Sequence, residues 1–202
     1  MFNDVDTIRP FDRLHGVPCR GHDSGDLMVL FDRTFLRPYR TCLRGGADEP
    51  LYEPAQGRDD VHTIWFTRDY FASALHEVAH WCVAGPARRQ QRDYGYWYAP
   101  DGRTSDQQAE FERVEVKPQS LEWLFSEAAG WRFRPSADNL EAELGPSPAF
   151  CQAIVEQVHA YCRRGVNARA EAFLASLSAF YGTARDVRSL LSPERFAGDV
   201  VA

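Results

Sequence analysis

The chain has 202 residues, a formal net charge of −6 and a hydrophobic fraction of 44%. A chain of this length can bury its own core as one domain, and the acidic balance argues against non-specific nucleic-acid binding as its main function. The five cysteines include no Cys-x-x-Cys pair, which is typical of reduced thiols. No signal peptide or membrane-spanning run is recognisable, so we expect a cytoplasmic protein with neither a membrane nor a nucleic-acid partner.

The N-terminal part of the sequence is irregular. Residues 1–23 mix proline and glycine with scattered charge, so we expect an N-terminal extension there and a single domain over 24–202. Ser24 begins a stretch in which apolar residues recur at helical spacing. This stretch predicts a helix that stops near Pro38.

Short strands are expected next. The segment 39–44, closed by two glycines, predicts a short strand, and the segment 61–66, which is β-branched and aromatic, predicts a second. The segment between them contains Pro50 and Pro54, and we expect it to be a loop. Asp69 is the expected N-cap of the helix that follows.

That helix carries the sequence His-Glu-Val-Ala-His at 76–80. Because His76 and His80 are four residues apart, their imidazoles lie on one face of a helix and can reach one metal ion. Zn(II) and Fe(II) both accept such a pair and normally take a third protein ligand, often a carboxylate. Two helical histidines can also arise by accident, but the complete motif inside an apolar helix favours a metal site.

The second half of the chain is predicted to be mainly helical. The aromatic run at 94–98 and the Asp-Gly that follows predict a hairpin, and a long helical region spans 104–129. We expect Pro118 to kink or divide that region. Two apolar stripes indicate further helices near the C-terminus. The order of helix, strands, helix, hairpin and helices predicts an α+β fold with a small sheet flanked by helices.

Several carboxylates in the 104–129 region are candidates for the third ligand. On a helical wheel Glu115 lies about 40° from the apolar stripe at Phe111, whereas Glu112 lies about 100° away. Glu122 is also near the stripe but follows Pro118. Glu115 is therefore the first choice and Glu112 the reserve. Lys117 and Gln119 are candidates for outer groups near Glu115.

Two chemistries fit these ligands. In a zinc peptidase or other metal hydrolase, Glu77 of the motif would act as general base on metal-bound water. In a non-haem iron oxygenase, two histidines and one carboxylate form a facial triad with positions open for oxygen and substrate. The spacing alone does not separate these alternatives. A third is a metal-stabilised binding module without enzymatic activity.

Two weaker features follow the motif. The basic run Arg88, Arg89 and Arg92 fits an acidic partner surface, although a short charge run is more often a solvated face. The aromatic run at 94–98 fits a channel for an amine-bearing side chain, but a packed hairpin explains it equally well.

Several motifs follow one another between residues 48 and 130: DEPLY at 48–52, YFASALHEVAHWC at 70–82, AGPARR at 84–89, YGYWY at 94–98, PDGR at 100–103 and FERVEVKPQ at 111–119. With these motifs, residues 48–130 resemble the elongation factor P hydroxylase family, and SADNLE at 136–141 also fits it. Residues 1–23 look like an extension, and the C-terminal helices match only loosely.

The resemblance implies a metal held by His76, His80 and a carboxylate, which we place at Glu115. It implies an α+β fold similar to that of the metal-dependent endoribonuclease YbeY. The implied reaction is oxygen-dependent hydroxylation of the β-lysylated lysine of elongation factor P, with Fe(II) and O₂ as cofactors and another divalent metal able to occupy the site. Glu77 stays a candidate catalytic residue beside these ligands.

Overall fold

The computed structural model describes residues 21–94, 103–137 and 145–196. The predicted extension over 1–23 lies outside these ranges except for 21–23, and the predicted aromatic hairpin over 94–98 lies outside them except for Tyr94. The described helices and strands are α1 Ser24–Tyr39, β1 Thr41–Ala47, β2 Leu51–Glu53, β3 His62–Thr67, α2 Phe71–Val83, α3 Ser105–Ala129, α4 Pro148–Arg164, α5 Ala168–Tyr181 and α6 Val187–Leu190, with short 3₁₀ helices at Arg88–Gln90 and Pro193–Phe196.

The three strands form a mixed sheet in the order β1-β3-β2. β1 runs parallel to β3, with Leu43 opposite Ile64, whereas β2 runs antiparallel to it. The two longer strands confirm the prediction. The loop expected between these two strands is wrong at Leu51–Glu53, because these residues pair with β3 to form β2. A strand this short has no sequence period and depends on its partner strand.

The first helix confirms its predicted stripe. Leu27, Leu30, Phe31 and Phe35 are all buried, and α1 packs against β1. The helix begins after Asp23, whose side chain accepts a hydrogen bond from the backbone N–H of Gly25. It runs through Pro38 to Tyr39, and Arg40 then takes the left-handed conformation with φ 49°.

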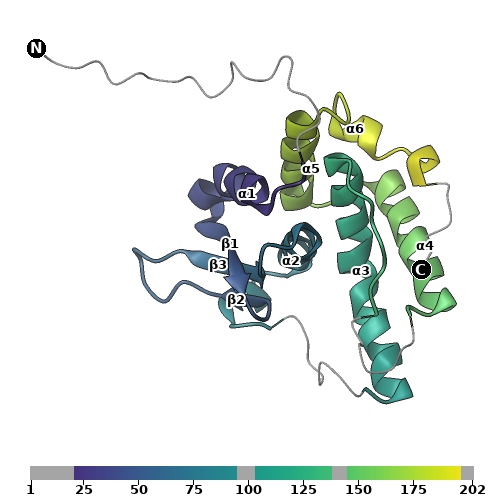
Figure 1. The fold of residues 1–202 in the computed structure, drawn as a ribbon, viewed down its shortest axis with the longest axis horizontal. Helices are drawn as coiled ribbons and strands as arrows, with labels where there is room; N and C mark the ends of the chain where they lie inside the picture. Colours follow the sequence, from purple (N-terminus) through teal and green to yellow (C-terminus); the bar gives the residue numbers. More distant parts are fainter. Residues whose placement is uncertain (1–20, 95–102, 138–144, 197–202) are drawn as a thin grey trace, which may run out of the picture.

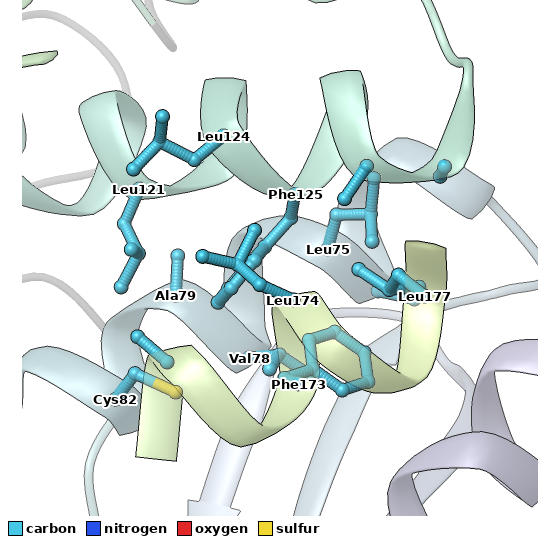
Figure 2. Close-up of a cluster of buried hydrophobic side chains, with 14 of the residues drawn as sticks. Leu75, Val78, Ala79, Cys82, Leu121, Leu124, Phe125, Phe173, Leu174 and Leu177 are labelled. Carbon is cyan, nitrogen blue, oxygen red and sulfur yellow. The ribbon is translucent and has the colours of Figure 1, made fainter. Parts of the chain in front are cut away.

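The motif helix α2 lies at the centre of the molecule, between the sheet and α3 (Figure 1). Its apolar face meets α3 and α5, where Leu75 and Val78 lie among leucines and phenylalanines of both neighbours (Figure 2). The predicted N-cap is wrong: α2 begins after Tyr70, without a side-chain cap. Because the N–H of Tyr70 donates to the carbonyl of Thr67 in a turn, the helix starts one residue too late for Asp69 to cap it.

Helix α3 is one continuous helix of 25 residues. It begins with a capping box in which Thr104 and Gln107 satisfy each other's backbone groups, and Gly130 ends it at φ 66°. Pro118 lies inside it, so the expected division at this residue is wrong. Pro118 is buried, and the residues around it pack against α2, α4 and α5. Tertiary packing therefore outweighs the loss of one helical hydrogen bond.

The arrangement confirms the predicted fold class, a single α+β domain with a three-stranded sheet and helices (Figure 1). The C-terminal helices confirm their stripes: Phe150, Ile154 and Val158 of α4 are buried, as are Phe173 and Leu177 of α5. In the ranges that the structure describes, every helix is too short or too polar to span a bilayer.

Candidate metal centre

The two motif histidines lie on the face of α2 that is not packed into the apolar core. Their side chains keep 26% (His76) and 17% (His80) of their surface exposed. The two rings meet edge to face with centroids 4.6 Å apart, and the two Nε2 atoms are separated by 3.0 Å. One turn of helix therefore brings both imidazole nitrogens to one point, as their spacing predicts.

Helix α3 brings Glu115 to the same point. Its Oε1 lies 3.2 Å from Nε2 of His80, and its Oε2 lies 3.6 Å from Nε2 of His76. Glu115 is only 3% exposed. Among the described residues, His76, His80 and Glu115 are the one group of three or more potential ligands whose ligand atoms all lie within 4.8 Å of one another.

These separations are close to the dimensions of a metal site. Ligand atoms about 2.1 Å from a shared ion, at right or tetrahedral angles, lie about 3.0 to 3.4 Å apart. Two of the observed values, 3.0 and 3.2 Å, lie in that range, and the third, 3.6 Å, is slightly longer. A buried carboxylate facing two imidazole nitrogens also needs a cation or a proton between them, since burying an unpaired charge is costly.

Glu122 holds the other side of the His76 ring. Its Oε2 lies 2.8 Å from Nδ1 of His76, and it is 8% exposed. A carboxylate can only accept here, so Nδ1 carries a proton, and Nε2 faces Glu115 and His80, where it can bind a metal ion once it has lost its own proton. From the sequence, Glu122 is a candidate metal ligand, and its contact with Nδ1 of His76 is not predicted. Its position seven residues after Glu115, on the same face of α3, is the signal that could have found it.

Gln119 lies between the two glutamates on α3. Its side-chain amide exchanges two hydrogen bonds with the backbone of Ser136, donating at 2.8 Å and accepting at 3.0 Å. The same amide nitrogen donates to Oε2 of Glu115 at 3.5 Å. The placement of Gln119 near Glu115 was predicted, whereas Lys117 is exposed and away from this group.

The reserve ligand Glu112 does not reach the cluster. Its carboxylate accepts hydrogen bonds from the backbone N–H of Ser147 at 3.1 Å and from the Ser147 hydroxyl at 2.6 Å. Ser147 is the N-cap of α4, so Glu112 fastens the start of that helix to α3. Of the first choice and the reserve, the structure brings only Glu115 to the histidines.

The charges of the cluster shift the pKa values of His76 and Glu115. Burial alone would lower the pKa of His76, but the carboxylates of Glu122, Glu115 and Glu77 outweigh it and raise that pKa to about 10. Burial opposes ionisation of Glu115, but the imidazoles of His80 and His76 lower its pKa to about 2. Without an ion, a proton on His76 supplies the positive charge that the carboxylates require.

Glu77 lies beside the cluster rather than in it. It is half-buried and, with His80, lines a pocket whose walls also include Tyr52, Trp81 and Arg89. Burial raises the pKa of Glu77, although the imidazoles of His80 and His76 act in the opposite direction. Glu77 is therefore a carboxylate able to carry a proton at the edge of a cavity.

The basic run beyond α2 divides into two kinds of arginine. Arg88 forms an ion pair with Asp93, and Arg92 lies 3.5 Å from the carboxylate of Glu53. Arg89 instead donates from its guanidinium to the backbone carbonyl of Ala84 at 2.5 Å. It forms no ion pair within the described ranges.

Two histidines from one helix and a buried carboxylate from the next, in an α+β domain, define a candidate mononuclear metal protein, a class that contains both hydrolases and oxygenases. Comparison with known proteins narrows this class. The family model described as elongation factor P hydroxylase matches residues 30–190, and the chain belongs to that family. A relative from Haemophilus influenzae, named elongation factor P lysine hydroxylase, is 47% identical over 166 residues, which cover 82% of this chain and 93% of the relative.

Proposed function

We propose that this chain is a metal-dependent hydroxylase that acts on the β-lysylated lysine of translation elongation factor P. The observation that carries the proposal is the convergence of His76, His80 and Glu115 inside the region that matches the hydroxylase family. The name of the relative supports elongation factor P as the substrate. Because that substrate belongs to translation, we also place the enzyme in the cytoplasm.

In this proposal His76, His80 and Glu115 hold Fe(II), and the enzyme uses O₂. The ligand set fits, since two imidazole nitrogens and one carboxylate leave several coordination positions open. Bound Fe(II) would supply the activation of O₂ that hydroxylation of an aliphatic carbon needs. Another divalent ion of similar size could take the same three ligands.

The chain's own residues have separable tasks. Glu122 keeps the proton of His76 on Nδ1 and so orients the ring, while Gln119 restrains Glu115 from the backbone of Ser136. Glu77 borders the pocket and is the carboxylate positioned to hold or release a proton beside the substrate. The walls formed by Tyr52 and Trp81 would limit the access of water to the reacting side chain.

Two structural expectations belong to the same proposal. The three-stranded sheet and the central motif helix are compatible with the predicted likeness to the YbeY endoribonuclease fold. The start of α1 at Ser24 supports a domain over 24–202 preceded by an extension. A solved structure of a family member in superposition with YbeY would test the first, and a truncation that begins at residue 22 would test the second.

The decisive experiment is intact mass measurement of β-lysylated elongation factor P after incubation with this protein, Fe(II) and air. We expect the substrate to gain one oxygen atom with the wild-type chain and none with the variants His76→Ala and Glu115→Ala. Glu112→Gln is the matched control, since Glu112 lies on the same helix but faces Ser147, and it should keep the activity.

Other outcomes would change the assigned activity or the assigned metal ligands. Tightly bound zinc, no oxygen gain, and a peptidase activity that disappears in Glu77→Gln would establish the metal hydrolase instead. An oxygen gain that survives Glu115→Ala but not Glu112→Gln would keep the function and refute the ligand set.

A further inference from the structure

A second pocket, of about 250 Å³, adjoins the one that His80 lines. The two pockets share Tyr52, Trp81 and Arg89, so these side chains stand between them. The other residues that line the second pocket are Pro38, Tyr39, Arg40, Thr41, His62 and Gln90. None of the nine lining residues is a carboxylate, whereas two are arginines.

The polar side chains around this second pocket are mainly donors. Nδ1 of His62 accepts from the backbone N–H of Ala55 at 3.0 Å, which places the proton of the neutral ring on Nε2. Nε1 of Trp81 is buried and has no hydrogen-bond partner in the described part of the chain. The Tyr52 hydroxyl already donates to the Arg89 carbonyl at 2.9 Å. A lining with surplus donors and two cations suits an anion.

Arg89 is the residue best prepared to bind that anion. Its backbone carbonyl is held by Tyr52, and one guanidinium nitrogen is held by Ala84, so the side chain is oriented. A guanidinium has five N–H donors, and the described residues satisfy Arg89 at this one nitrogen only. Its neighbours differ, because Arg88 and Arg92 each face a carboxylate. The half-buried charge of Arg89 therefore lacks a counter-charge among the described residues.

The positive charge around the second pocket also affects the pKa of His62. Burial lowers the pKa of its imidazole, and the guanidinium groups of Arg40 and Arg89 lower it further. Arg40 is itself fixed, since its guanidinium donates to the backbone carbonyls of Gly57, Arg58 and Asp60. The two arginines thus present a fixed cationic edge.

We propose that Arg89 binds a carboxylate carried by the protein substrate, next to the pocket that receives the side chain to be modified. This inference rests on the proposed function. The rim of the second pocket includes the exposed residues Pro38, Arg40 and Gln90, so a macromolecule can cover it. A protein whose lysine reaches His80 through the first pocket must lie over this rim. An acidic side chain beside that lysine would then meet Arg89.

The test compares Arg89→Gln and Arg89→Lys with the wild-type chain. We expect Arg89→Gln to raise both the Kd and the KM for β-lysylated elongation factor P between about 10- and 100-fold, because a charge-assisted pair is lost. The value of kcat should change less than about twofold. Arg89→Lys keeps the positive charge but loses the planar guanidinium group, so the Kd should rise less than in Arg89→Gln. The matched control is Arg188→Gln, an exposed arginine in α6, which should leave all constants unchanged.

Two further measurements separate binding from structural damage and from other ligands. Affinity for the metal should be equal in Arg89→Gln and wild type. A tri-glutamate peptide should inhibit the wild type more strongly than tri-glutamine does, and Arg89→Gln should be inhibited equally by the two peptides. Unchanged Kd and KM in Arg89→Gln would overturn the proposal. The proposal would also be overturned if turnover required a small carboxylate as co-substrate and Arg89→Gln raised only the KM for that co-substrate. If wild type adds no oxygen, the function itself fails, while the Kd comparison still decides the role of Arg89.

Discussion

On one face of α2, Leu75, Val78 and Ala79 have no exposed surface and pack against α3 and α5, whereas on the other, His76 and His80 remain partly exposed and face carboxylates. The first face stabilises the fold by about 1.5 to 3 kcal/mol for each large apolar side chain that it buries. The second costs free energy unless its charges are compensated. One helix thus places a rigid apolar support directly behind a group of ligands that requires a cation.

The largest expected effect comes from weakening the apolar face. Leu75→Ala should lower the free energy of unfolding by about 2 to 5 kcal/mol, since it leaves a cavity among α2, α3 and α5. Chemical denaturation monitored by tryptophan fluorescence would measure the loss. Val83→Ala, on the same helix but 37% exposed, should change stability by less than about 0.5 kcal/mol. Similar losses in the two variants would contradict the division of the helix into two faces.

Removing a ligand tests the polar face. Glu115→Ala should weaken binding of Fe(II) or Co(II) by more than about 100-fold. Residues that only orient a ligand usually cost at most about 100-fold in metal affinity when they are replaced. Metal titration followed by isothermal calorimetry would measure it. The metal-free variant should stay folded, because removing the Glu115 carboxylate leaves no buried negative charge at that position to be compensated. Unchanged metal affinity would exclude Glu115 as a ligand.

A smaller change is expected at the residue behind the ligand. Glu122→Ala should weaken metal binding by about 10- to 100-fold, and Glu122→Gln should weaken it less, because the amide oxygen can still accept from Nδ1 of His76. Glu127→Ala is the matched control on α3, since Glu127 pairs with Arg195 at the surface. Equal affinities in wild type and Glu122→Ala would mean that His76 is oriented by its packing alone.

A change of one pH unit has the smallest expected effect on metal affinity. The metal competes with the proton on His76, whose pKa is raised to about 10 in the metal-free protein, so affinity should rise by up to about tenfold per pH unit as the pH increases toward 10. For the apo protein the sign is opposite. The stability that the raised pKa contributes is fully present below pH 6.5, the ordinary histidine value, and is lost as the pH rises through about 10. Calorimetry at several pH values should detect about one proton released per ion.

The sequence predicted what depends on local spacing. The face shared by His76 and His80 follows from a spacing of four residues, and the position of Glu115 follows from the edge of an apolar stripe. The contact between Glu122 and His76 depends on how α3 lies along α2, which no local pattern contains. For the same reason β2 was missed and Pro118 was expected to interrupt a helix that tertiary packing preserves.

The cluster joins α2 to α3, two helices separated by the segment 84–104, so an ion bound there would hold them together only in the folded state. At a free concentration 100 times its Kd, such an ion adds about 2.7 kcal/mol to the stability. In a cell with little available metal the chain would unfold more often and be degraded sooner. The supply of the metal would then set how much of the protein a cell retains, as well as how much of it is active.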